Sequence, residues 1–368
     1  MRTPALALAT LIAAAPDAFA RSSVTLFGVV DLGVRYVDND TFGSNESSTQ
    51  LAPNGMATSG IGVRGVEDLG GGLAASFWLE AGFAPDTGAG MGRNGTGEAG
   101  REALAFNLRS TVSLSNRWGE LRLGRDYTPT YWSVTAFDPF GTSGVGSAGN
   151  LFLGADLRAL TNPGDSFGTL VRANNTVGYI LPGGQFGPGL YGQLMVAPGE
   201  DAPLNKYGGG RIGYAAGAFD VAAAYGRTGV DAADTLALRN WNLAGAWSLG
   251  RFGRVTAYYG QIALDLPAGG RAEQSNWYLG YALPIGVWNL KFSYGAVRQD
   301  GPPSLSDPRA RQVALGAVYN LSPRTAVYAT VSSLSNEGGA TFLVAPSSVT
   351  PSPGLSSFGT EIGLRLMF

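Results

Sequence analysis

The chain has 368 residues and a formal net charge of −2, with 14% charged residues, 11% aromatic residues and 56 glycines. Charged residues usually make up about a quarter of a soluble domain, so this composition is unusual for a soluble protein, and the charge does not favour nucleic acid as a partner. Cysteine and histidine are both absent, which excludes disulfides, histidine-assisted nucleophiles and ordinary zinc sites, whereas a site built from carboxylates alone stays open.

The N-terminal twenty residues have the pattern of a secretory signal peptide. Arg2 precedes an apolar stretch, Leu6–Ala15, and Ala18-Phe19-Ala20 forms an A-x-A cleavage site. Such a segment is removed on export and does not belong to the fold. We therefore predict a signal peptide over 1–20 and one mature domain over 21–368.

Alternation of apolar and polar residues recurs along the rest of the chain. In the stretch 286–298, for example, Trp288, Leu290 and Phe292 alternate with Lys291 and Ser293. A period of two residues is typical of β-strands with two unlike faces. Sixteen strands are predicted, at 23–36, 58–67, 72–83, 106–116, 119–126, 170–181, 186–197, 206–216, 219–228, 239–249, 252–264, 273–283, 286–298, 309–320, 324–334 and 356–368.

The connections between these strands alternate between short and long. Tight turns such as EDLGG, SNRWG and NLSPR are followed by long polar segments, of which 127–169 is the longest. Antiparallel membrane barrels alternate in this way, and several strands have the roughly ten residues that a tilted strand needs to cross a bilayer. A propeller would show a forty-residue repeat, and stacked sandwiches would not keep the alternation. The fold class predicted is all-β, a sixteen-stranded antiparallel transmembrane β-barrel.

The last strand ends the chain with GTEIGLRLMF. Leu364, Leu366 and Phe368 share one face, whereas Glu361 and Arg365 lie on the other. With an even number of strands, the first and last strands can pair and leave no open edge in the bilayer. We expect Leu364, Leu366 and Phe368 to face lipid and to form the signal that the outer-membrane assembly machinery recognises.

Several motifs, in this order, resemble those of general diffusion porins of Gram-negative β-proteobacteria. They are SSVTLFGVVDLGV, SGIGVRGVEDLGGGL, LRLGRDYTPTYW, DPFG, RANNTVGY and YNLSPRTAVYA, and the resemblance covers about Ser22 to Phe368. One departure is Leu366, which stands where the family has histidine in its last strand. The resemblance implies an outer-membrane homotrimer, in contact with lipid and lipopolysaccharide, that passes small hydrophilic solutes and anions without a cofactor.

The resemblance also implies that the third external loop, 127–169, folds inward and narrows the pore. The residues of this loop support the same prediction. It is far longer than ordinary connections, and loops of such length are usually functional. It is also rich in glycine and serine yet contains apolar residues, Phe137, Phe140, Leu151, Phe152 and Leu153, that a solvated tip would not need.

Strand phase predicts which charged residues line the pore. An arginine at mid-depth on the lipid side costs about 2–4 kcal/mol, so arginines that alternate with apolar residues should point inward. Arg64 and Arg172 match the family's motifs, and the other members of the basic wall follow from phase alone. We predict a basic wall of Arg35, Arg64, Arg109, Arg122 and Arg172, opposed by Asp138, Asp165 and Glu80.

The function predicted is a water-filled channel for passive diffusion, somewhat selective for anions. A solute-selective channel and a structural or adhesive barrel with a plugged lumen are the alternatives. An enzyme built on a barrel is disfavoured because such chemistry usually needs histidine. We expect no cofactor and no metal.

Overall fold

The computed structural model describes residues 22–91, 104–152, 165–199, 205–302, 307–345 and 350–368. Almost all regular structure in these ranges is β-strand, and no described helix has the length and hydropathy needed to cross a membrane. The strands are β1 Ser23–Asp40, β2 Asn45–Pro53, β3 Gly60–Gly70, β4 Leu73–Gly82, β5 Arg109–Asn116, β6 Gly119–Tyr127, β7 Arg172–Ile180, β8 Gly189–Ala197, β9 Tyr207–Ala216, β10 Phe219–Gly229, β11 Ala237–Ser248, β12 Arg254–Asp265, β13 Arg271–Ile285, β14 Trp288–Asp300, β15 Arg309–Asn320, β16 Thr325–Glu337 and β17 Ser357–Met367.

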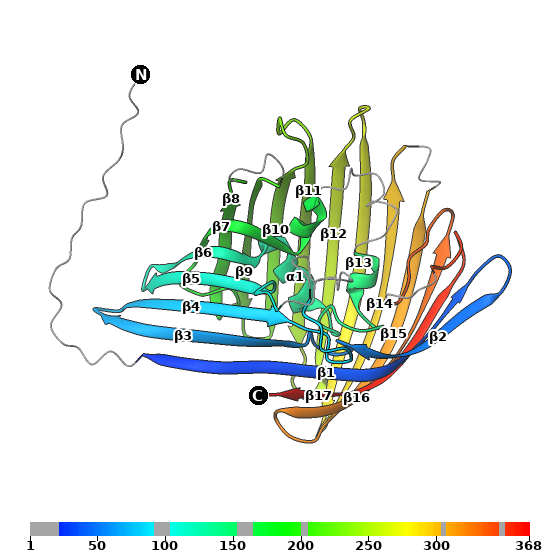
Figure 1. Ribbon diagram of the computed structural model, residues 1–368, viewed down its shortest axis with the longest axis horizontal. Coiled ribbons are helices and arrows are strands. Elements are labelled where there is room, and N and C mark those ends of the chain that lie inside the picture. Colours follow the sequence, from blue (N-terminus) through cyan, green and yellow to red (C-terminus); the bar gives the residue numbers. More distant parts are fainter. Residues whose placement is uncertain (1–21, 92–103, 153–164, 200–204, 303–306, 346–349) are drawn as a thin grey trace.

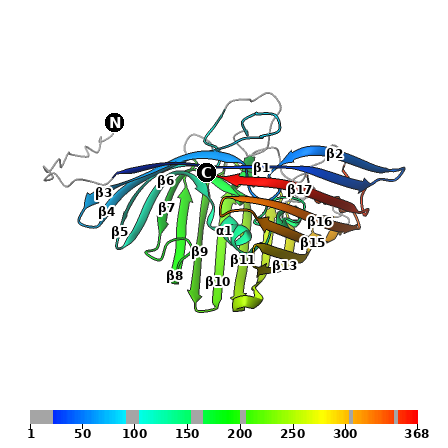
Figure 2. The ribbon, with the colours of Figure 1, turned by 90° about the horizontal axis from the view of Figure 1, so that it is seen from below.

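The strands form one closed antiparallel ring. From β3 to β17 each strand pairs with the next along the chain, and β1 completes the ring by pairing with both β17 and β3. The views in Figures 1 and 2 show this wall curving around α1 (Pro129–Phe137), which lies within it. The prediction of a sixteen-stranded barrel is confirmed, with β2 as an additional strand.

Strand β2 was not predicted, because its sequence lies inside the polar segment 37–57. It pairs with the outer half of β1, from Leu32–Pro53 to Asp40–Asn45. Figure 1 shows the β1–β2 hairpin reaching past the rest of the wall. The turn before β8 also differs, since β8 begins at Gly189 rather than at residue 186, which lengthens this short connection.

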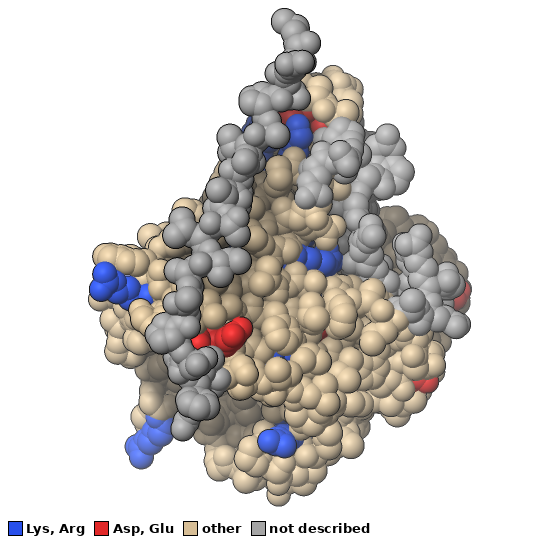
Figure 3. All heavy atoms as spheres, turned by 60° about the vertical axis from the view of Figure 1, so that its left-hand side comes forward, with Lys and Arg blue, Asp and Glu red and all other residues tan. Residues whose placement is uncertain are grey.

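Side chains alternate between lumen and membrane along the sixteen strands of the ring, as the sequence indicated. On β17, for example, Ile362 and Leu364 are exposed on the outer face, whereas Glu361 is buried in the lumen. The face of the molecule drawn in Figure 3 accordingly carries only scattered charged side chains. A bilayer supplies no water to solvate charge, so such a surface suits contact with lipid or with another apolar surface.

The barrel closes at the C-terminal residue. The backbone N–H of Phe368 donates to the Gly28 carbonyl at 3.1 Å, and the N–H of Gly28 donates to the Phe368 carbonyl at 3.0 Å. Glycine is needed at position 28, because a Cβ there would lie 2.4 Å from the Phe368 ring and 2.8 Å from the carbonyl oxygen of Gly60. Phe368 is 44% exposed, and Leu364 and Leu366 share its outward face.

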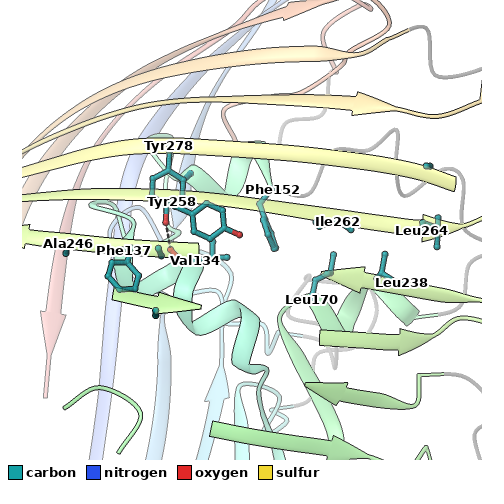
Figure 4. Close-up of a cluster of buried hydrophobic side chains, with 14 of the residues drawn as sticks. Val134, Phe137, Phe152, Leu170, Leu238, Ala246, Tyr258, Ile262, Leu264 and Tyr278 are labelled. Carbon is teal, nitrogen blue, oxygen red and sulfur yellow. Dashed lines mark hydrogen bonds between the residues drawn. The ribbon is translucent and has the colours of Figure 1, made fainter. Parts of the chain in front are cut away.

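The segment between β6 and β7 turns into the barrel and forms α1. Pro129 starts this helix, where its missing N–H and fixed φ are tolerated, and the helix stops at Asp138, whose extended backbone is the conformation favoured before a proline such as Pro139. In Figure 4, Val134 and Phe137 of the helix pack beside Tyr258 and Tyr278 of the wall. The 3₁₀ turns η1 (Ala148–Leu151) and η2 (Asp165–Leu170) lie in the same loop.

Candidate functional site

Lumen-facing side chains of the wall bind the backbone of the inward loop at several points. Four wall donors reach loop carbonyls at 2.9–3.0 Å: Asn242 to Thr130, Tyr278 to Val134, Gln312 to Ser147, and Gln274 to Phe152. They come from β11, β13 and β15, so the loop is attached to the wall over this run of five neighbouring strands. The described parts of this loop, 127–152 and 165–169, therefore lie fixed inside the barrel, as the sequence predicted for the loop.

Asp138 lies inside the loop itself and does not face open lumen. Its carboxylate accepts the backbone N–H groups of Phe140, Thr142 and Ala148 at 2.9–3.0 Å, and the residue is only 6% exposed. Burial raises the pKa of the Asp138 carboxyl, and these three hydrogen bonds oppose that rise. The carboxylate thus stabilises the conformation of the loop. Its electrostatic field acts on the pore through the surrounding protein, because the group itself is buried.

Arg35 pairs with the wall rather than with the loop. It lies opposite Glu361 across the β1–β17 seam, and its Nε donates to Glu361 Oε2 at 2.9 Å. The other carboxylate oxygen, Oε1, accepts the backbone N–H of Val145 at 3.1 Å. Glu361, which was not among the predicted site residues, therefore joins the last strand, the first strand and the loop.

Arg109 and Arg122 gather around a wall carboxylate, Asp126. Arg122 Nη1 lies 2.8 Å from Asp126 Oδ2, and Arg109 Nε lies 3.4 Å from Oδ1. Arg122 also contacts Glu120 at 2.8 Å. Both arginines face inward, as their strand phase predicted, but each is neutralised in part by a neighbouring carboxylate.

Arg64 belongs to the same region but has a different environment. Its guanidinium lies 5.1 Å from the centre of the Trp78 ring, and that of Arg109 lies 4.6 Å from it. The Trp78 Nε1–H donates to Glu80 at 2.9 Å. Arg64, Arg109, Arg122 and Trp78 line a cavity of about 510 Å³, and among the described residues no carboxylate lies within ion-pair distance of Arg64.

The two remaining predicted residues are Arg172, which does not line this cavity, and Asp165. Arg172 stands where the loop returns to the wall; its Nε donates to the Leu108 carbonyl at 3.0 Å and its Nη2 to the Tyr127 hydroxyl at 2.7 Å. It therefore packs against the base of the loop. Asp165 begins η2, but its side chain lies outside the described part of the chain.

Three further cations face the lumen and were not predicted as site residues. Arg211 donates from Nε to Ser133 of α1 at 3.1 Å, Lys291 lies 5.5 Å from the Phe140 ring, and Arg365 lies opposite Asp31 in the strand register. In the part of the chain that the structure describes, none of the three has a carboxylate within ion-pair distance. The alternation along their strands could have predicted that all three point inward, because each lies between outward-facing residues.

Comparisons with known proteins agree with this architecture. A family model described as "Gram-negative porin" matches residues 5–339. The chain is 34% identical to outer membrane porin protein 32 of Delftia acidovorans over the whole of both chains, and 29% identical to an outer membrane porin of Bordetella pertussis over 89% of this chain and 93% of that one. The solved structure of an anion-selective porin from Comamonas acidovorans superposes with a TM-score of 0.80, at 30% identity, over 95% of this chain and 100% of that chain.

Proposed function

Because the chain belongs to the Gram-negative porin family and is therefore an outer-membrane porin, we propose that its pore favours anions among the small hydrophilic solutes that diffuse through it. The observation that carries this proposal is an imbalance in how lumen charges are neutralised. Arg64, Arg211, Lys291 and Arg365 face the lumen without an ion-pair partner among the described residues. The similarity to an anion-selective porin supports the same direction.

The lumen carboxylates, in contrast, are occupied by protein donors. Asp31 accepts the backbone N–H groups of Met56 and Ala57 and the Tyr328 hydroxyl at 2.6–2.7 Å. The carboxylates of Asp138 and Glu361 are bound as described above. Since a carboxylate with several donors attracts a passing cation less than a free one does, the unpaired cations dominate the field in the pore.

We propose a basic wall with fewer members than the sequence predicted, and its acidic neighbours lie on the wall strands instead of on the loop. Arg64 is its strongest member, Arg109 and Arg122 support it, and Arg35 contributes less because Glu361 lies against it. Glu80, which accepts from Trp78, lies beside this cluster together with Glu120 and Asp126. A transverse field between such groups discriminates ions at close range.

The outer wall supports a homotrimer. Exposed Trp and Tyr side chains lie on β7–β14, where they suit the two interfaces of a bilayer. On the strands of the other side, the exposed large apolar side chains among the described residues are aliphatic or phenylalanine, and the exposed Trp118 lies in the turn between β5 and β6. This aliphatic wall comprises β15–β17 and β1–β6, with Val34, Leu51, Val112, Leu114, Leu121, Leu123, Val327, Val331, Ile362 and Leu364. It fits contact with two further copies better than contact with lipid headgroups, and it includes the first and last strands.

Planar-bilayer recording of the purified protein tests the channel and its selectivity together. Stable conductance steps are expected, and a salt gradient should give a reversal potential on the anion side. A barrel that does not conduct would support the plugged, structural alternative. A reversal potential on the cation side would contradict the anion preference without affecting the family assignment.

Electrophoresis in mild detergent without heating tests the trimer. The wild-type protein should migrate as a trimer, and Leu51→Arg on the aliphatic wall should convert it to a monomer, whereas Leu279→Arg on the aromatic-bearing side should not. A wild-type monomer in every detergent would contradict the proposal. The signal peptide at 1–20 and an assembly signal formed by Leu364, Leu366 and Phe368 complete the proposed route to the outer membrane.

A further inference from the structure

A groove of about 790 Å³ runs over the outer face of β9–β13. Its floor is a diagonal row of three small outward residues, Ala223, Gly245 and Ala257, on adjacent strands. Larger side chains stand on both sides, Ile212 on one and Leu279 on the other. The lining is almost entirely apolar, so its occupant must offer hydrocarbon and needs no hydrogen bonds.

The groove lies toward the short-turn end of the barrel, which is the periplasmic side of an outer-membrane barrel. Gly245 pairs with Ala257, and only three residues further along, Ser248 pairs with Arg254, where the β11–β12 turn begins. Three strand residues span about 10 Å. Between floor and turn, Trp247 stacks on Phe219 with ring centres 5.7 Å apart. Such exposed aromatic pairs mark the level of the lipid headgroups.

A cation lies in the β11–β12 turn, beyond the periplasmic end of the groove, where a headgroup would lie. Arg251 is exposed in the β11–β12 turn, and its guanidinium lies 4.8 Å from the Phe252 ring. No carboxylate of the described residues lies within ion-pair distance of it. The outward arginines at the opposite end differ, because Arg239 and Arg271 share Asp265 at 2.8 and 3.2 Å. A lipid phosphate can therefore pair with Arg251 at the periplasmic end, whereas Arg239 and Arg271 at the opposite end are already paired with Asp265.

We propose that this groove holds one acyl chain of a glycerophospholipid of the periplasmic leaflet, whose phosphate pairs with Arg251. The chain lies over Gly245 and Ala257, where the missing side chains leave room against the strand backbone. The glycerol region passes Trp247, and the phosphate reaches the β11–β12 turn. Lipopolysaccharide, which occupies the opposite leaflet, would approach the other end of the strands, where the arginines are already paired.

Native mass spectrometry of the detergent-purified full chain, after incubation with dipalmitoyl phosphatidylethanolamine, tests the site. The double variant Gly245→Leu/Ala257→Leu fills the groove. A side chain is tolerated at position 245, because a Cβ there would meet its nearest atoms at 3.4 and 3.5 Å, an ordinary contact. Ala296→Leu, on the outward face of β14 and outside both the groove lining and the aliphatic wall, is the matched control. Heat-modifiable migration shows that each variant is folded.

The wild type and Ala296→Leu should retain one phospholipid per chain, and the double variant should lose it. Arg251→Gln should reduce retention about five-fold, which corresponds to the roughly 1 kcal/mol of one arginine at a lipid surface. Equal retention by wild type and double variant would overturn the groove as the site. Retention unchanged in Arg251→Gln would overturn the headgroup placement. Preferential capture of purified lipopolysaccharide over the phospholipid would overturn the choice of leaflet.

Discussion

Removing the charge of Arg64 should weaken the anion preference of the pore. It should change the packing around this side chain only little. The side chain is exposed, and the rings of Phe27 and Trp78 lie 5.5 and 5.1 Å from its guanidinium. Glutamine keeps much of the stem and removes the charge. Because no described carboxylate is paired with Arg64, Arg64→Gln leaves no ion-pair partner behind.

The size of the effect follows from Coulomb's law. For an ion that passes about 8 Å from the guanidinium, the interaction is about 0.5 kcal/mol in water and about 2 kcal/mol at an effective dielectric constant of 20. Even at the lower figure, an anion loses about 0.5 kcal/mol and a cation regains as much, so the difference is about 1 kcal/mol. The anion-to-cation permeability ratio should then fall about five-fold, given that about 1.4 kcal/mol corresponds to tenfold.

Reversal potentials in a low-salt gradient measure this ratio, and Arg298→Gln is the control. Arg298 lies on the outward rim of β14, paired with Asp300 at 2.7 Å, so its loss changes the net charge equally but outside the pore. Arg64→Gln should shift the potential toward cations, and the shift should shrink in molar salt, where the Debye length is about 3 Å. The reasoning is refuted if Arg64→Gln matches the wild type at low salt, or if Arg298→Gln shifts the potential as far.

Three further predictions concern closure, the seam and pH. Gly28→Ala places a methyl group against the Phe368 ring and should lower the yield of heat-resistant folded barrel on gels; an unchanged yield would contradict the proposed fit. Glu361→Gln leaves Arg35, 6% exposed, without its carboxylate, and calorimetry should show a stability loss of about 3–5 kcal/mol; adding Arg35→Gln should recover most of it, and no recovery would rule out the pair as the cause. Burial raises the pKa of the Asp138 carboxyl, so this residue gains a proton earlier than an ordinary aspartate as pH falls. The reversal potential should therefore move further to the anion side between about pH 7 and about pH 4, while arginines stay charged, and movement toward cations would be inconsistent with this.

The alternation of residues made the barrel and the direction of its side chains predictable. Lipid requires an apolar residue at every second position, and the cost of a misplaced arginine, about 2–4 kcal/mol, fixes the phase of each strand. Arg64, Arg109 and Arg122 therefore face inward as predicted. Strand β2 was missed because its sequence, NESSTQLAP, is mostly polar and lacks the alternation, although it pairs with β1 from Leu32–Pro53 to Asp40–Asn45.

The partners of the lumen charges were decided only by the tertiary structure. Arg35 and Glu361 are 326 positions apart and meet because the ring closes between β1 and β17. Asp138 sits on the inward loop, as predicted, but its carboxylate turns to the loop's own N–H groups. Strand phase is a local property that says which way a side chain points. Whether a charge is neutralised depends on contacts between residues far apart in the chain, which exist only once the barrel has closed around its loop.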